Sequence, residues 1–144
     1  MAFFGTSKVT LDTKGRFAIP TRYRASIAEE CGGKMWITLG PRKELWLLTD
    51  PSWVRLNESL ASRPVTDPFR NRLINNADML EIDLDGGGRV LIPSGLREKG
   101  VLPNPNLAFR GGGNHFEVWD WDTHMKVEED DQPAVEASAA DFNF

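Results

Sequence analysis

The sequence predicts an α+β fold, mainly β, made of two copies of one small unit with short helices. Three observations predict it. A ten-residue phrase occurs twice, at residues 11–20 and again at residues 84–93. Each occurrence is followed by a short helical segment and then by two apolar, β-prone runs. The chain has 144 residues, which suits two half-sized units that share one core.

The repeated phrase combines an acid, a glycine, an arginine and a closing proline. It reads LDTKGRFAIP in the first copy and LDGGGRVLIP in the second. The alternating residues on either side predict two short strands joined by a turn in each copy. Asp12 and Asp85 are expected to form the turns by accepting backbone hydrogen bonds. Gly15 and Gly88 are expected to supply the positive φ that such turns require.

The remaining elements follow from apolar periodicity and from capping residues. An acid followed by proline, at Asp50–Pro51 and at Asp67–Pro68, is typical of a helix start. Short helices are also expected over 21–31 and 94–100, and hairpins over 35–48 and 107–119. The chain thus divides into a first module over 1–50, a connecting helical pair over 51–79, a second module over 80–125 and an acidic, disordered tail over 126–144.

The charge is divided unevenly along the chain, although the net charge is −4. Residues 1–119 hold 16 Lys and Arg against 13 Asp and Glu, a balance of +3. Residues 120–144 hold one Lys against eight Asp and Glu, a balance of −7. A mildly basic body favours a polyanionic partner such as nucleic acid. We hypothesise that the acidic tail competes for the basic turns or shields them from nonspecific DNA.

Several function classes are not expected. The chain has no apolar run of about 18 residues and no signal-peptide pattern, so we expect a cytoplasmic protein without a membrane partner. The lone Cys31 excludes an internal disulfide, and two histidines do not predict a metal site. The acids at 83–85 lack the spacing of a calcium loop. No nucleophile–histidine set lies near either turn, so we expect no enzyme activity, no cofactor and no small-molecule substrate.

The arginine after each glycine is the candidate functional residue, because a turn alone does not need it. Arg16 and Arg89 suit contact with phosphates or with the guanine edge, and the alternative is a salt bridge within the fold. Lys14 at the turn tip suits phosphate contact, or is merely solvated. Possible flanking residues are Lys8, Arg22, Arg24 and Arg97, of which the three arginines can equally pair with acids of their own copy.

The doubled phrase, with a short helix and a hairpin after each copy, resembles the MraZ family of bacterial regulators, which have two SpoVT/AbrB-type modules in one chain. The resemblance covers residues 1–125 and includes the FEVWD stretch at 116–120. It implies tandem swapped-hairpin modules that form one pseudo-dimeric β-barrel. It also implies ring-shaped homo-oligomers that bind repeated boxes in double-stranded promoter DNA, and a nucleoid-associated autorepressor of the division and cell wall gene cluster.

The resemblance also assigns DNA-facing residues, which fall on Lys14, Gly15 and Arg16 in the first copy and on Gly88 and Arg89 in the second. The second copy has two glycines in place of the tip lysine, so we expect it to contribute less to binding. Two other functions stay open, an AbrB-like antitoxin and a ring scaffold that does not bind DNA. The antitoxin predicts a co-purifying toxin, and the scaffold predicts that Arg16→Ala and Arg89→Ala leave function intact.

Overall fold

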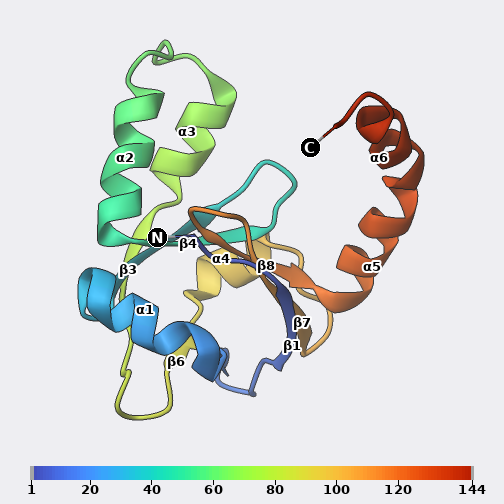
Figure 1. Cartoon of the computed structure of the whole chain (residues 1–144). Coiled ribbons are helices and arrows are strands. Elements are labelled where there is room, and N and C mark those ends of the chain that lie inside the picture. Colours follow the sequence, from blue (N-terminus) through green and yellow to red (C-terminus); the bar gives the residue numbers. More distant parts are fainter. Residues whose placement is uncertain (1, 144) are drawn as a thin grey trace.

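The repeated phrase and the segments after it form the same series of elements in both halves of the chain. The computed structural model describes residues 2–143 and contains an open six-stranded antiparallel sheet, a separate two-stranded sheet and six helices (Figure 1). The strands are β1 (Thr6–Thr10), β2 (Arg16–Ala18), β3 (Lys34–Leu39), β4 (Leu45–Thr49), β5 (Asp78–Glu81), β6 (Arg89–Leu91), β7 (Asn106–Gly111) and β8 (Phe116–Asp120). The helices are α1 (Thr21–Cys31), α2 (Asp50–Leu60), α3 (Pro68–Asn75), α4 (Ser94–Lys99), α5 (Trp121–Asp130) and α6 (Gln132–Ala139).

The two copies exchange strands. The large sheet has the order β1-β7-β8-β4-β3-β5, so β1 pairs with the hairpin of the second copy and β5 pairs with the hairpin of the first. The small sheet joins β2 of the first copy to β6 of the second. The strands on either side of each turn therefore do not pair with one another as a simple hairpin would. Pairing across copies lets two units, each too small to bury a sufficient core, share one.

The small sheet is organised about a pseudo-two-fold axis. Phe17 lies opposite Val90, and these residues occupy equivalent positions of the repeat. The flanking backbone hydrogen bonds show the same symmetry, both at 2.9 Å: Ile19 N to Gly88 O and Ile92 N to Gly15 O. Each turn is thereby tied to the strand of the other copy.

The core is drawn from both copies. Phe17, Val90, Phe109 and Phe116 are almost fully buried, and the Phe109 and Phe116 ring centroids are 4.8 Å apart. Burying a side chain of this size stabilises the fold by about 1.5–3 kcal/mol. The shared core accounts for why neither copy is a separate globular unit.

The described strands do not close into the predicted β-barrel. β1 and β5 remain as the two edges of the large sheet, and β2 and β6 form a sheet of their own. β2 and β6 have three residues each, and the phrase that contains them ends in Pro20 and Pro93. Proline cannot donate to a ladder. The two short strands therefore end before they can join the edges of the larger sheet.

The connecting helices begin near the predicted positions, with one change of cap. Asp67 caps α3, since its Oδ2 accepts a hydrogen bond from Arg70 N at 2.9 Å. Thr49 rather than Asp50 caps α2, through a 3.4 Å bond from Ser52 N to Thr49 Oγ1. Asp50 instead accepts the indole N–H of Trp36 at 2.9 Å.

The C-terminal segment is helical where the sequence predicted a disordered tail over 126–144. Asp120 caps α5 by accepting the Thr123 N–H at 3.1 Å, and α5 packs against β7 and β8. Every residue of α6 is exposed, so α6 is held by α5 more than by the body of the protein. The prediction missed the cap at Asp120, which ends β8 as Thr49 ends β4.

Replacing Phe17 by alanine should destabilise the protein by about 3–5 kcal/mol, because a large ring on the pseudo-two-fold axis would leave a cavity. The matched control is Phe4→Ala, which deletes the same group where the side chain is 72% exposed. That change should alter the free energy of unfolding by less than about 0.5 kcal/mol. Chemical denaturation at equal protein concentration measures both, and equal losses would contradict the central place given to Phe17.

Candidate nucleic-acid interface

The first turn is built by Asp12, as the sequence predicts. Its Oδ1 accepts backbone hydrogen bonds from Lys14 N at 2.9 Å and from Arg16 N at 2.8 Å. The backbone N–H of Arg16 is the main cause of a lowered pKa at Asp12, so the carboxylate is ionised at neutral pH. Gly15 completes the turn with a φ of 82°. Lys14 is left exposed at the tip.

Arg16 combines the two roles that the sequence left as alternatives. Its Nε donates to Asp12 Oδ2 at 3.2 Å, which is an ion pair within the fold. The side chain nevertheless keeps 36% of its surface exposed. Within residues 2–143 the described hydrogen bonds of this guanidinium use Nε alone. Asp12 therefore orients Arg16 and leaves its terminal nitrogens for a ligand.

The second turn is built differently, and Asp85 is not the residue that orders it. Asp83 Oδ1 accepts Gly86 N at 2.7 Å, and the Asp83 carbonyl accepts Gly88 N at 2.8 Å. Asp85 is exposed and takes part in none of the side-chain hydrogen bonds described for residues 2–143. Gly87 and Gly88 both have positive φ, at 103° and 67°, whereas the first turn has one such residue. The three successive glycines let the loop fold back so that its backbone amides reach Asp83, which lies two residues before Asp85.

Arg89 lies on the same surface as Arg16. Both line a shallow hollow of about 190 Å³ whose other lining residues include Asp12 and Phe17. Arg89 is exposed, and no hydrogen bond or ion pair of its side chain is described within residues 2–143. The structure thus brings the equivalent arginines of the two copies together, one oriented by an acid and one without such a partner.

The four possible flanking residues have different surroundings. Lys8 lies over the Trp121 ring at 5.1 Å, and Arg22 donates to Ser7 Oγ at 2.7 Å. Arg24 and Arg97 are half-buried and lie against Gly88 and Gly15 respectively. In the part of the chain that the structure describes, none of the three arginines pairs with an acid of its own copy.

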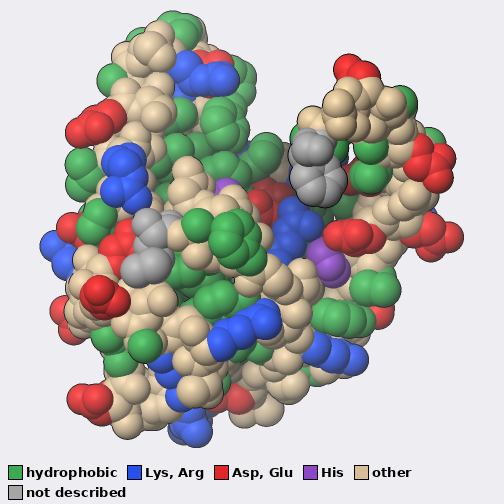
Figure 2. All heavy atoms as spheres, viewed as in Figure 1, with side chains coloured by type: hydrophobic (Ala, Val, Ile, Leu, Met, Phe, Trp, Pro, Cys, Tyr) green, Lys and Arg blue, Asp and Glu red, His purple; other side chains and the backbone are tan. Residues whose placement is uncertain are grey.

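The turns and the acidic helices lie on different sides of the molecule. Both turns are at the lower edge in Figure 1, and α5 and α6 stand at the right. In the same orientation, Figure 2 shows Asp and Glu side chains gathered over α5 and α6, and side chains of both charges over the lower part of the molecule. The turns themselves hold Lys14, Arg16 and Arg89 against Asp12, Asp83 and Asp85, and Arg24 and Arg97 lie against their glycines.

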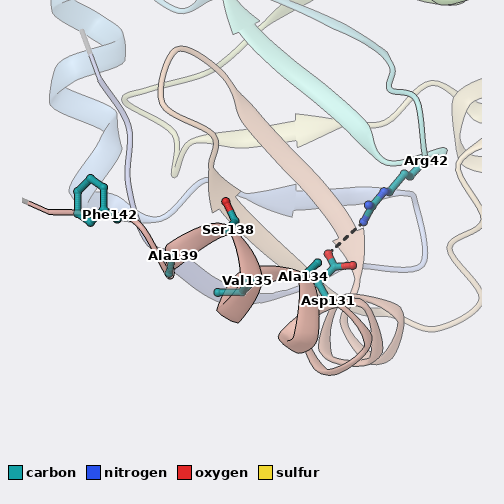
Figure 3. A pocket seen from close by; sticks show the side chains of 7 residues that line it. All are labelled: Arg42, Asp131, Ala134, Val135, Ser138, Ala139 and Phe142. Atoms are coloured by element: carbon teal, nitrogen blue, oxygen red, sulfur yellow. Dashed lines mark hydrogen bonds and ion pairs between the residues drawn. The ribbon is translucent and has the colours of Figure 1, made fainter.

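A second hollow has a different character. It has a volume of about 530 Å³ and lies between α6 and Arg42, which pairs with Asp131 at 3.5 Å (Figure 3). Its remaining lining is small or apolar and includes Val135 and Phe142.

Residues 2–143 contain no group of three His, Cys, Asp or Glu placed to bind a metal ion. Nor do they include a helix long and apolar enough to cross a membrane.

The sequence matches a protein family along nearly its whole length. The MraZ family model, described as "MraZ protein, putative antitoxin-like", matches residues 2–76 and again residues 77–144. The chain belongs to the MraZ family. A protein named Transcriptional regulator MraZ from Thioalkalivibrio sulfidiphilus is 40% identical over 126 residues, which is 86% of this chain and 83% of that relative. Another of the same name from Paraburkholderia xenovorans is 36% identical over 128 residues, 88% of each chain.

The two MraZ matches also show which helices are equivalent. The first match ends after α3 and the second extends through α6, so each repeat has a hairpin followed by a helical pair. Thr49 and Asp120, which cap the first helix of each pair, end the equivalent strands β4 and β8. The signal for helix at the C-terminus was therefore present as a polar cap directly after the second hairpin.

Gly15→Ala should lower the free energy of unfolding by more than the strain of alanine at a positive φ explains. A Cβ at Gly15 would lie 2.6 Å from the Arg97 guanidinium, and φ is 82°. Gly32 is the matched control, because its φ is 65° and nothing lies within 4 Å of the added Cβ. Gly32→Ala should lower the free energy of unfolding by about 1–2 kcal/mol, and the loss for Gly15→Ala should be larger by at least about 1 kcal/mol. Chemical denaturation measures both losses. Equal costs would mean that Arg97 does not restrict the turn.

Proposed function

We propose that the protein is a transcriptional regulator that binds specific double-stranded DNA through its two turns. The observation that carries the proposal is the convergence of Arg16 and Arg89 on one surface hollow. The arginine fork suits bidentate contact with guanine or with phosphate. Lys14, exposed at the tip of the first turn, supplies a further phosphate contact. The name of the relatives, Transcriptional regulator MraZ, supports the same function.

Gly15 and Gly88 serve this surface by shape rather than by hydrogen bonding. Their backbone N–H groups already donate within the turns, to Asp12 O at 3.1 Å and to Asp83 O at 2.8 Å. What the glycines provide is the positive φ that brings the following arginine to the surface. The two turns contribute differently: the first offers Lys14 and an oriented arginine, and the second offers an arginine without an intramolecular partner.

Assembly strengthens the binding in this proposal. A subunit offers about three basic contacts, and a good bidentate base contact discriminates by about 1–3 kcal/mol. A ring-shaped homo-oligomer that presents several identical turns to repeated promoter boxes gains avidity of about 10²–10⁴ over one site.

By the family resemblance, we propose autorepression of the division and cell wall gene cluster by a nucleoid-associated protein. We also propose the module boundaries 1–50 and 80–125.

Arg16→Ala and Arg89→Ala should each weaken binding to the DNA upstream of the protein's own gene by about 5- to 150-fold, with folding and assembly intact. Fluorescence anisotropy at two salt concentrations measures the change, with scrambled DNA for comparison. Arg63→Ala is the matched control, since this exposed arginine pairs with Asp67 on the connecting segment. Wild-type affinity in both turn variants, or equal binding to both DNAs, would reject the proposal.

Neutralising the acidic stretch of α5 should raise nonspecific DNA affinity. The variant Glu128→Gln, Glu129→Gln, Asp130→Asn removes three exposed negative charges and keeps the helix. At low salt we expect affinity for scrambled DNA to rise several-fold, about what removing long-range repulsion gives, and the gain to vanish at high salt. Lys126→Gln changes the charge in the opposite sense and controls for surface substitution. Unchanged affinity at low salt would remove the tail from the mechanism.

A further inference from the structure

Each glycine of the DNA-facing turns lies against an arginine of the other copy. Arg97, on α4 of the second copy, lies against Gly15 of the first, and a Cβ at Gly15 would be 2.6 Å from its Cζ and Nη1. Arg24, on α1 of the first copy, lies against Gly88 of the second, and a Cβ there would be 2.5 Å from its Nε. A side chain at either glycine would displace the arginine.

The arrangement occurs twice although the two loops differ. Arg24 and Arg97 occupy equivalent positions of the repeat, whereas the loops have different sequences and are ordered by different acids. Because the same contact occurs in both copies although the loops differ, it depends on the strands and helices that the copies share. The crossed packing is therefore a property of the fold and not of one loop.

Arg24 is also tied to the backbone beside the turn that it covers. Its Nε donates to Ile19 O at 2.8 Å, and Ile19 N donates to Gly88 O at 2.9 Å. One guanidinium thus links α1, the end of β2 and the turn of the second copy. In the equivalent contact between Arg97 and Gly15, the Nε of Arg97 is buried, and no hydrogen bond from it is described within residues 2–143. The described contact of that side chain at the turn is its close approach to Gly15.

We propose that Arg24 and Arg97 are positioning residues, each holding the DNA-facing turn of the other copy, rather than flanking DNA contacts. The inference rests on the proposed DNA-binding function. Both side chains are half-buried beneath the turns, unlike the exposed Lys14 and Arg89. Loss of Arg24 should therefore impair the turn that carries Arg89, and loss of Arg97 should impair the turn that carries Arg16.

Double-mutant cycles test this crossed dependence. In the wild-type background at low salt, Arg24→Ala should weaken specific DNA binding about tenfold. In the Arg89→Ala background the added loss should fall below about twofold, and in the Arg16→Ala background it should stay near tenfold. Arg97→Ala should show the opposite pattern. Losses that add equally in both backgrounds would mean that these arginines contact DNA themselves, and would overturn the proposal.

Two further variants separate position from charge. Arg24→Lys keeps the charge but loses the planar fork that bonds to Ile19 O and lies on Gly88, so it should stay close to Arg24→Ala. Recovery of wild-type affinity would indicate a simple phosphate contact. Arg22→Ala removes the same charge from the same helix, where the side chain bonds to Ser7, and should leave the cycles unchanged.

Hydrogen exchange without DNA gives a test that does not depend on binding. Arg24→Ala should speed amide exchange over residues 83–90 and leave residues 12–17 as in the wild type, and Arg97→Ala should do the reverse. Exchange that changes in the arginine's own copy, or in neither turn, would overturn the proposal. Wild-type affinity of Arg16→Ala and Arg89→Ala would reject DNA binding, and the exchange result would still decide whether the arginines hold the turns.

Discussion

The antiparallel pairing of β2 with β6 is the interaction on which the rest of the structure depends. It joins two three-residue strands about Phe17 and Val90, and its flanking hydrogen bonds reach the carbonyls of Gly15 and Gly88. Without it neither copy has a core of sufficient size, and the two turns have no fixed relation. Because the pairing is centred on equivalent residues, it places both turns on one side of the molecule. The placement of Arg16 and Arg89 beside one hollow follows from the way the core is closed.

A carboxylate lies beside the arginine of the first turn, and the hydrogen bonds within the turn account for its position. Asp12 uses both oxygens within the turn, on two backbone amides and on Arg16 Nε, although its side chain remains exposed. The second copy moves the ordering acid to Asp83, and Arg89 has no described partner among residues 2–143. An oriented arginine has less rotamer entropy left to lose than a free one. The two turns therefore present their arginines differently, although the arginines occupy equivalent positions of the repeat.

Local structure was largely predictable from the sequence, and the relations between copies were not. The helix at 21–31, both hairpins and the turn at Asp12 follow from capping, alternation and Asx chemistry, which act over a few residues. The exchange of strands, the open sheet and the contact of Arg24 with Gly88 join residues far apart in the chain. Asp83 replaced Asp85 because three successive glycines admit several loop paths, and no pattern in the sequence chooses among them.

The opposite end of the pseudo-two-fold axis shows where the copies are free to diverge. Trp46 and Glu117 face each other at the centre of the β4–β8 pairing. Burial raises the pKa of Glu117, but hydrogen bonds from His115 and Trp119 and the charge of Arg110 outweigh it and hold the pKa at about 2. An ionised acid thus stands in one copy where the other has an indole. The symmetry is kept at Phe17 and Val90 because both turns depend on it there. It is lost at Trp46 and Glu117, where the Glu117 carboxylate is hydrogen-bonded and the buried Nε1 of Trp46 has no hydrogen bond described within residues 2–143.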